Sequence, residues 1–345
     1  MGEVILKVTL TDIARELNIT AATVSRALNN HPAIRESTKK LVREAAEKLQ
    51  YQPNKIASSL RLGKSNIIGV IIPSAEINFF GSVIHGIEKI ANENNYNVLI
   101  YQTNEAYEYE KRGVQTFLQS QVDGVLASIS KETINLDHYN EIKRRGVPLI
   151  LFDRAVDTMG VSSVVVDDYA GAFAATKHLI MQGCRRIAHI GGQQHVSIFN
   201  QRLKGYIDAL NVHNIPVDED LIVYGKVSIE SGKDRMKRLL KLASPPDALF
   251  AVEDFTALGA LQAIKEADKK IPDDIAVVGF ANEPFGEYIT PSLSTVNQKT
   301  AQMGEEAAKL FFKTFRNNGV ARPEPFKLVL QPELVVRQSS LKNYK

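Results

Sequence analysis

The sequence predicts two kinds of fold in one chain: a small all-α helix-turn-helix domain and, after it, a larger α/β core built on parallel sheets. Three observations carry this prediction. Apolar residues recur at helical spacing over residues 9–49, and short β-branched runs alternate with amphipathic stretches from residue 64 onward. Charge is also uneven, because residues 1–64 contain 11 lysines and arginines against 6 acidic residues, while the remainder is nearly neutral.

The composition is that of an ordinary globular protein. The chain has 345 residues, of which 44% are hydrophobic and 23% are charged. Its one cysteine, Cys184, excludes a disulfide framework and a multi-cysteine metal site. The apolar run near residue 1 is too short for a signal peptide, so none is expected, and no apolar run approaches the roughly 18 residues of a membrane span. We therefore expect a cytoplasmic protein without a membrane partner, whose basic head binds a polyanion.

Two capped helices joined by a tight turn are expected at the start of the chain. Thr9 is a capping residue for a first helix whose apolar stripe reaches Leu17. Residues 18–19 break the pattern, and Thr20 is placed to cap a second helix. A third helix is expected over about residues 35–49, where the inward side chains would be Leu41, Val42, Ala45, Ala46 and Leu49.

The second helix presents short and basic side chains on its outer side, because Val24, Ala27 and Leu28 occupy its inner side. In a DNA major groove, Arg26 can donate two hydrogen bonds to guanine O6 and N7, and alanines can contact thymine methyl groups. Hydroxyl and amide side chains have the reach for phosphate oxygens. The expected DNA-contacting residues of this helix are Thr20, Ala21, Ala22, Thr23, Ser25, Arg26 and Asn29.

The segment that follows extends this pattern into a hinge. The stretches TLTDIAREL and TVSRALN are followed at fixed spacing by Tyr51, Pro53-Asn54, Ala57 and Leu60, then by a strand entry at 67–70. On these residues the chain resembles the lactose/galactose-repressor family of bacterial transcription regulators. The resemblance implies that Tyr51, Asn54, Ala57 and Leu60 contact DNA, and that the leucine wedges into the minor groove.

The resemblance also implies a domain organisation. Residues 1–52 would form the helix-turn-helix domain, 53–64 the hinge helix or linker, and 65–340 a two-lobed core like that of a periplasmic binding protein. Strand-like runs such as NIIGVIIP, VPLILFD and IAVVGFAN supply more strands than one small sheet can hold. Lobe 1 would comprise about 65–163 and 293–324, and lobe 2 about 164–292 and 325–340. A ligand would bind between the lobes, at the carboxyl ends of the strands.

Polar and aromatic side chains at strand ends are the candidates for this ligand site. Carboxylates and an arginine around an aromatic face suit a polyhydroxylated ligand, and Arg202 lies where the family keeps a ligand-binding arginine. Two departures from the family pattern, Glu253-Asp254 and Ala281-Asn282, alter the hydrogen-bonding capacity, and an acidic sugar is disfavoured beside Glu253. The candidate residues are Phe79, Phe80, Asp153, Arg154, Arg202, Glu253, Asp254, Asn282 and Glu283.

Two other classes of function fit the sequence less well. An enzyme is disfavoured because HIGGQQ (189–194) lacks the third glycine of a dinucleotide fingerprint, and no P-loop, HExxH or G-x-S-x-G occurs. No catalytic residue, cofactor or metal site is therefore expected. A solute-binding protein for transport would share the core fold, but it would carry an export signal and no basic helix-turn-helix.

The sequence therefore predicts a sequence-specific DNA-binding transcriptional regulator that acts as a repressor. Its expected partners are a palindromic double-stranded operator, a second copy of the chain, and a small effector bound between the lobes, a sugar or sugar derivative. A homodimer is expected because one helix-turn-helix reads too few base pairs to select a site in a genome.

Overall fold

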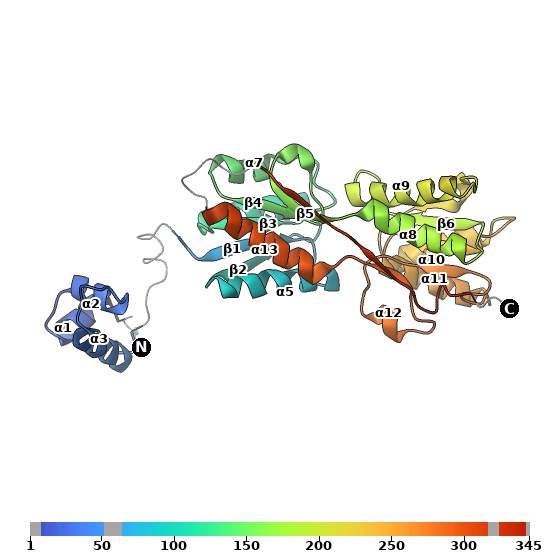
Figure 1. Cartoon of the computed structure of the whole chain (residues 1–345). Coiled ribbons are helices and arrows are strands. Elements are labelled where there is room, and N and C mark those ends of the chain that lie inside the picture. Colours follow the sequence, from blue (N-terminus) through green and yellow to red (C-terminus); the bar gives the residue numbers. More distant parts are fainter. Residues whose placement is uncertain (1–7, 52–63, 317–323, 343–345) are drawn as a thin grey trace, which may run out of the picture. The chain divides into compact units, whose positions relative to one another are not determined.

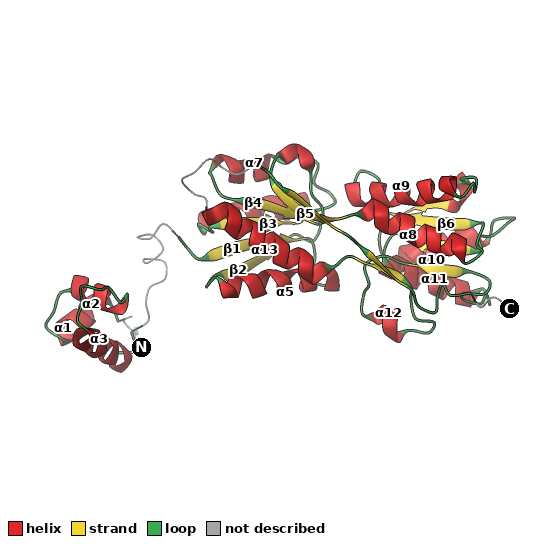
Figure 2. Cartoon of the chain, in the orientation of Figure 1, coloured by secondary structure: helices red, strands yellow, loops and turns green. Residues whose placement is uncertain are grey.

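The computed structural model of the chain describes residues 8–51, 64–316 and 324–342. The chain divides into two compact units, with the boundary between Ser65 and Asn66. Figure 1 follows the chain from the first unit in blue to the last strands in red, and Figure 2 separates its helices from its strands. Three residues expected to form the hinge, Asn54, Ala57 and Leu60, lie outside the described residues.

The first unit contains the three expected helices, α1 (Leu10–Glu16), α2 (Ala21–Leu28) and α3 (Glu36–Lys48). Thr9 and Asp12 form a capping box at the start of α1, and the Thr20 side chain accepts a hydrogen bond from Thr23 N at the start of α2. The three helices enclose one small core, whose fully buried members are Ile13, Val24, Ala27 and Val42.

One expected core position of this unit is wrong. Leu41 is 55% exposed, although Val42, Ala45 and Ala46 beside it are buried. Residues three and four apart share a helix face, so Val42, Ala45 and Ala46 define the buried stripe. Leu41 lies about 100° from Val42 and about 140° from Ala46 around α3, at the margin of that stripe, where its side chain is open to solvent.

The first lobe of the core is built on a six-stranded sheet of order β11-β5-β4-β3-β1-β2, in which every neighbouring pair is parallel. Ile68, Val70 and Ile72 pack against one set of helices, and Ile71 between them faces the other set, as strand alternation requires. The strands are β1 (Ile67–Ile72), β2 (Asn97–Gln102), β3 (Gly124–Ala127), β4 (Leu149–Phe152), β5 (Ser162–Val166) and β11 (Lys327–Leu330).

Helices cover both faces of this sheet (Figure 1). On one face lie α5 (Asn78–Glu93) and α13 (Thr300–Arg316), and on the other lie α6 (Tyr107–Gln119) and α7 (Asp137–Arg144). A short 3₁₀ turn, η1 (Asp157–Met159), precedes β5. The backbones of α5 and α13 approach so closely that a Cβ added at Gly86 would lie 2.1 Å from Ala301 O.

The second lobe repeats the architecture on a smaller scale, with a four-stranded parallel sheet of order β7-β6-β8-β9. Its strands are β6 (Ile187–Gly191), β7 (Ile222–Tyr224), β8 (Ala248–Ala251) and β9 (Ala276–Val278). Its helices are α8 (Asp168–Met181), α9 (Ser197–Val212), α10 (Ile229–Leu240), α11 (Asp254–Glu266) and α12 (Phe285–Tyr288), with the 3₁₀ turn η2 (Glu219–Leu221). These strands and helices enclose two further apolar clusters.

The chain passes between the lobes at more than one place, and the observed lobe boundaries differ from the expected ones. One passage follows β5, and two others run through β10 (Thr295–Asn297) and β12 (Glu333–Val335), which pair with each other as an antiparallel ribbon. Because β11 pairs with β5, residues 327–330 belong to the first sheet, whereas they were expected in lobe 2. Ser294 was expected in lobe 1, but it bonds to Gly279 and Ser339 beside the second sheet.

Candidate functional site

The outer side of α2 is the first candidate site. Ala22, Arg26 and Asn29 are exposed there, while Thr23 and Ser25 are half-buried. No hydrogen bond or ion pair of the Arg26 side chain is made within the described parts of the chain, so its guanidinium is available to an external acceptor. The structure therefore groups five of the eleven residues that the sequence assigned to DNA on one accessible face.

Some members of this group also stabilise the helix itself. The Thr20 hydroxyl lies 2.9 Å from the Thr23 hydroxyl and caps α2, and Asn29 Nδ2 donates to Ser25 O over 2.7 Å. Ala21 was expected to face outward, but it is half-buried and packs against the core of the unit. Tyr51 also packs against this core, and its backbone N–H donates to Ala46 O over 2.8 Å.

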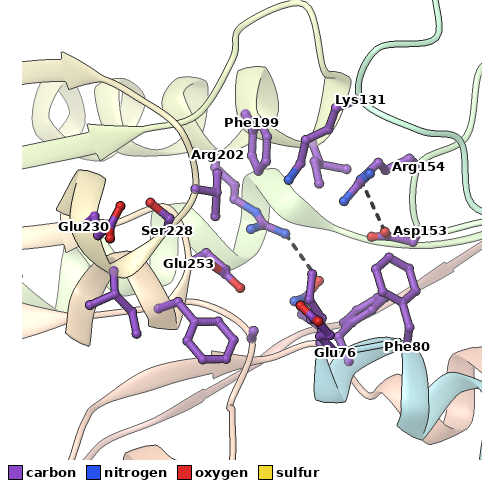
Figure 3. A pocket seen from close by; sticks show the side chains of 18 residues that line it. Glu76, Phe80, Lys131, Asp153, Arg154, Phe199, Arg202, Ser228, Glu230 and Glu253 are labelled. Atoms are coloured by element: carbon purple, nitrogen blue, oxygen red, sulfur yellow. Dashed lines mark hydrogen bonds and ion pairs between the residues drawn. The ribbon is translucent and has the colours of Figure 1, made fainter. Parts of the chain in front are cut away.

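The second candidate site is a cavity of about 500 Å³ within the core, lined by residues of both lobes (Figure 3). Six of the nine residues expected to bind the ligand line it: Phe79, Phe80, Asp153, Arg154, Arg202 and Glu253. The two phenylalanines pack edge to face with ring centroids 5.0 Å apart, and most of their surface is buried in the first lobe. They therefore form an apolar wall of the cavity, and little of either ring face is open for a ligand to stack on.

Arg202 on α9 is 2% exposed and firmly anchored. Its Nε donates to the Asp168 carboxylate over 2.8 Å, Nη1 donates to Val252 O over 2.7 Å, and Nη2 lies 2.7 Å from the same carboxylate. Its guanidinium carbon lies 3.7 Å from the centroid of the Phe280 ring. Burial raises the pKa of Asp168 to about 6, and Arg202 opposes that rise. Arg202 is therefore both part of the cavity wall and part of the core.

The first lobe contributes two more cations, Lys131 and Arg154. Arg154 is 7% exposed, and its Nε has no hydrogen-bond partner in the described chain, although it lies 3.8 Å from an Asp153 carboxylate oxygen (Figure 3). Asp153 has a φ of 60° and accepts a hydrogen bond from the Ser128 hydroxyl over 3.2 Å. Burial raises the pKa of Asp153, and Arg154 opposes that rise.

Glu253 at the start of α11 lines the cavity from the second lobe. Burial, with the neighbouring Asp254 carboxylate, raises the pKa of Glu253 to about 8. At neutral pH this side chain is therefore mainly protonated and can donate a hydrogen bond to a ligand oxygen. A protonated Glu253 would not repel an acidic sugar, so the expectation that such a ligand is disfavoured beside Glu253 depends on the protonation state of this side chain.

Three candidate residues do not line the cavity, namely Asp254, Asn282 and Glu283. Asp254 is fully buried behind it, where its carboxylate accepts from the Thr295 hydroxyl over 2.6 Å and from Glu283 N over 2.8 Å. Asn282 Oδ1 accepts from Arg337 over 3.0 Å. Burial raises the pKa of Glu283 to about 7, and the N–H of Phe79 opposes that rise. The polar groups of Asp254 and Asn282 are thus engaged in hydrogen bonds within the protein.

Sequence reasoning missed other lining residues, among them Glu76, Lys131, Phe199, Ser228, Glu230, Phe255 and Gln298. Lys131 lies shortly after β3, so the strand-end rule that selected Asp153 could have selected it too. Ser228 caps α10 and Glu230 lies in the first turn of that helix. The preceding strand β7 has only three residues, which is too short to stand out as a β-branched run.

No helix in the described residues is both long enough and apolar enough to cross a membrane. Comparison with known protein families assigns both units of the chain. Residues 9–54 match the bacterial regulatory proteins of the lacI family, and residues 176–340 match the periplasmic binding protein-like domain. The two matches fall on the two units described above.

Relatives cover nearly the whole chain. The "Probable HTH-type transcriptional repressor ExuR" of Bacillus subtilis is 34% identical over 96% of this chain and 98% of its own length. Catabolite control protein A of Priestia megaterium is 32% identical over 89% of this chain and 92% of its own length. The HTH-type transcriptional repressor CytR of Escherichia coli is 31% identical over 96% of both chains.

Solved structures agree with this assignment. A complex of the transcriptional regulator CelR with cellobiose superposes with a TM-score of 0.73 at 29% identity, covering 96% of this chain and all of that one. The lac repressor dimer bound to operator and the anti-inducer ONPF has a TM-score of 0.87 at 24% identity over 98% of this chain and all of that one, which shows the shared fold. The expected fold, an all-α head before a two-lobed parallel α/β core, is confirmed. The chain belongs to the lacI family of bacterial regulatory proteins and is a DNA-binding transcriptional regulator.

Proposed function

We propose that this regulator is a cytoplasmic, homodimeric repressor of a palindromic operator, and that a sugar or sugar derivative in the interlobe cavity controls its affinity for DNA. The observation that carries the proposal is the cavity of about 500 Å³, which both lobes line with charged side chains around apolar walls. Such a cavity can hold one small ligand, and polar groups converging on it suit several hydroxyls.

Both lobes supply hydrogen-bonding groups to the cavity. Asp153 and Arg154 come from the first lobe, and Ser228, Glu230 and Glu253 come from the second. A ligand that bonds to both sides stabilises the arrangement in which the two sides are close. If the DNA-binding unit binds its operator better in one arrangement of the lobes than in the other, the protein with an occupied cavity and the protein with an empty cavity differ in their affinity for DNA.

Similar proteins support the ligand class and the assembly. CelR was solved with cellobiose, and a regulator of the same family from Enterococcus faecium was solved with bound ribose, with a TM-score of 0.69 at 28% identity over 80% of this chain. The lac repressor was solved as a dimer on its operator. Carried over to this chain, these names favour a carbohydrate in the cavity and two chains on one operator.

The test begins with an operator selected from random DNA by the full-length protein. A thermal-shift screen of sugars, sugar acids and nucleosides then identifies compounds that raise the melting temperature, since a ligand that binds only the folded state stabilises it. Operator affinity is measured with and without each hit, at fixed salt. We expect a carbohydrate to change operator affinity and the operator to change carbohydrate affinity by the same factor. A carbohydrate that binds tightly while leaving operator affinity unchanged would refute the regulatory role of the cavity.

A further inference from the structure

Glu105, which follows β2 in the first lobe, has an unusual backbone conformation. Its φ is 64° and that of Asn104 is 52°, so two consecutive residues lie in the left-handed region. Asparagine adopts this region with some ease, whereas glutamate rarely does. Such backbone strain persists where surrounding contacts impose it, and it is concentrated at functional sites. The contacts of the Glu105 side chain are therefore of interest.

The Glu105 carboxylate holds two cations of the cavity wall. Its two oxygens accept from Arg154 Nη1 over 2.8 and 3.0 Å, and one of them accepts from the backbone N–H of Lys131 over 2.8 Å. The Lys131 ammonium lies 3.2 Å from the other oxygen. Burial raises the pKa of Glu105, but Arg154 and Lys131 outweigh that effect and hold it below its usual value, so the group is ionised.

These contacts determine which atoms the cations can offer to a ligand. Glu105 and the carbonyl oxygen of Ile129 occupy Nη1 of Arg154, and its Nε remains without a hydrogen-bond partner in the described chain. Glu105 itself does not line the cavity, whereas Arg154 and Lys131 do. The third lining cation, Arg202, is already bonded to Asp168 and Val252 O. Of the three cations that line the cavity, Glu105 therefore holds two, Arg154 and Lys131, and Asp168 holds the third.

Lys131 also connects the two lobes. Its carbonyl oxygen lies 2.9 Å from His195 Nε2 of the second lobe, and its ammonium lies 5.8 Å from the centroid of the Phe199 ring. The backbone N–H of Lys131 donates a hydrogen bond to the Glu105 carboxylate. A shift of Glu105 would therefore move a segment that contacts both the cavity and the opposite lobe.

We propose that Glu105 is a positioning residue that sets ligand specificity, because it fixes Arg154 and Lys131 in place and neutralises one of their two positive charges. The proposal rests on the proposed function of the cavity. Glu105, Arg154 and Lys131 together have a net charge of +1, which suits hydroxyl groups and limits the attraction for a carboxylate. Without the Glu105 charge, Arg154 and Lys131 lose one compensating negative charge, and this wall of the cavity becomes more favourable to an anionic ligand.

The test compares Glu105→Gln with Glu141→Gln in the full-length protein. Glu141 is a matched control, because it also accepts from two arginines, Arg144 and Arg145, but it lies on α7 and does not line the cavity. The probes are D-glucose, D-glucuronate and D-glucosamine, which present the same ring with neutral, negative and positive charge. In Glu105→Gln we expect the affinity for the acid relative to the neutral sugar to rise by roughly tenfold or more, as expected for removing one charge near a buried site. The Glu141→Gln ratio should equal that of the wild type.

A second readout needs no ligand. Amine-reactive labelling read by mass spectrometry should modify Lys131 several times faster in Glu105→Gln than in the wild type, since the ammonium loses its partner, while Lys309, paired with Glu306, should label at an unchanged rate. Glu105→Gly separates specificity from stability, because glycine adopts a positive φ freely, and it should fold while showing the same rapid labelling. If none of these three sugars binds any variant, the proposed function is decided by the wider ligand screen described above, and the labelling result alone decides the role of Glu105. An unchanged Lys131 labelling rate, or an unchanged acid-to-neutral ratio in a variant that binds both sugars, would overturn the proposal.

Discussion

Two arginines, Arg26 on α2 and Arg202 on α9, represent the two candidate sites, and their surroundings are opposite. Arg26 is exposed and makes no ion pair within the described chain, whereas Arg202 is 2% exposed and bonds to Asp168, Val252 O and Gln298. A residue that recognises an external partner from the surface contributes little to the fold. A residue that recognises a ligand from inside a cavity contributes to recognition and folding together. Substitutions at the two sites should therefore differ in kind.

The largest expected effect is that of Arg202→Ala. Removing one partner of a buried ion pair leaves the Asp168 carboxylate uncompensated, which costs about 3–5 kcal/mol of unfolding free energy. The variant should also lose its operator response to the ligand, while operator binding itself persists where the core remains folded. Urea denaturation and operator titrations with and without ligand measure the two effects. A variant that responds at the wild-type ligand concentration would show that Arg202 does not contact the ligand.

Arg26→Ala should produce the reverse pattern. We expect a loss of about 1–3 kcal/mol of discrimination between operator and non-operator DNA, because a bidentate contact to guanine is removed. The free energy of unfolding should change little, since the side chain is exposed. Binding titrations at matched salt, together with urea denaturation, test both parts. Equal discrimination by wild type and variant would contradict the assignment of this helix face to DNA.

A smaller effect is expected at the hinge, whose residues lie outside the described chain. Leu60→Ala should weaken specific binding and reduce the bend of the operator, because the apolar wedge is removed while α2 still reads the bases. The core should melt at the wild-type temperature. A circular-permutation gel assay measures the bend, and an unchanged bend angle would count against the wedge.

The last expected effect concerns Glu253→Gln and depends on pH. The folded protein raises the pKa of Glu253 from 4.5 to about 8, so between these values the folded state retains a proton that the unfolded state has lost. Stability from this group is therefore highest below pH 4.5 and falls as pH rises toward 8. Glu253→Gln should abolish this loss, because a neutral amide does not ionise in either the folded or the unfolded state. Melting curves of both proteins from pH 5 to 8 should diverge with the variant more stable, and parallel curves would refute the shift.

The sequence predicted the helix face better than the cavity, and the reason is geometric. Helix periodicity alone separates Val24 and Ala27, which are buried, from Arg26, which is exposed. The strand-end rule also selected Asp153 and Glu253, which line the cavity, because parallel strands end at a common edge. Their contact with a ligand stays a prediction. It could not assign Asp254, whose side chain turns away from the cavity to bond with Thr295 and Glu283 N.

Local sequence patterns could not predict the residues that lie next to very short strands or that act through ion pairs with distant parts of the chain. Glu230 follows a strand of three residues, and Glu105 acts through Arg154, which is 49 positions further along the chain. The lobe boundaries were displaced for a related reason. The pairing of β11 with β5 joins segments about 160 residues apart, and strand propensity does not specify such a partner.

The pairing of β11 with β5 also determines when the protein can finish folding during synthesis. The first lobe begins at Asn66, yet its edge strand at Lys327–Leu330 and its helix α13 are translated only after most of the second lobe. While these segments are still in the ribosome, β5 has an open edge and the apolar face covered by α13 is exposed. A nascent chain of this kind is vulnerable to aggregation until its last tenth emerges. A stop codon shortly before residue 327 would leave the first lobe without its edge strand, although most of the second lobe would already have been made.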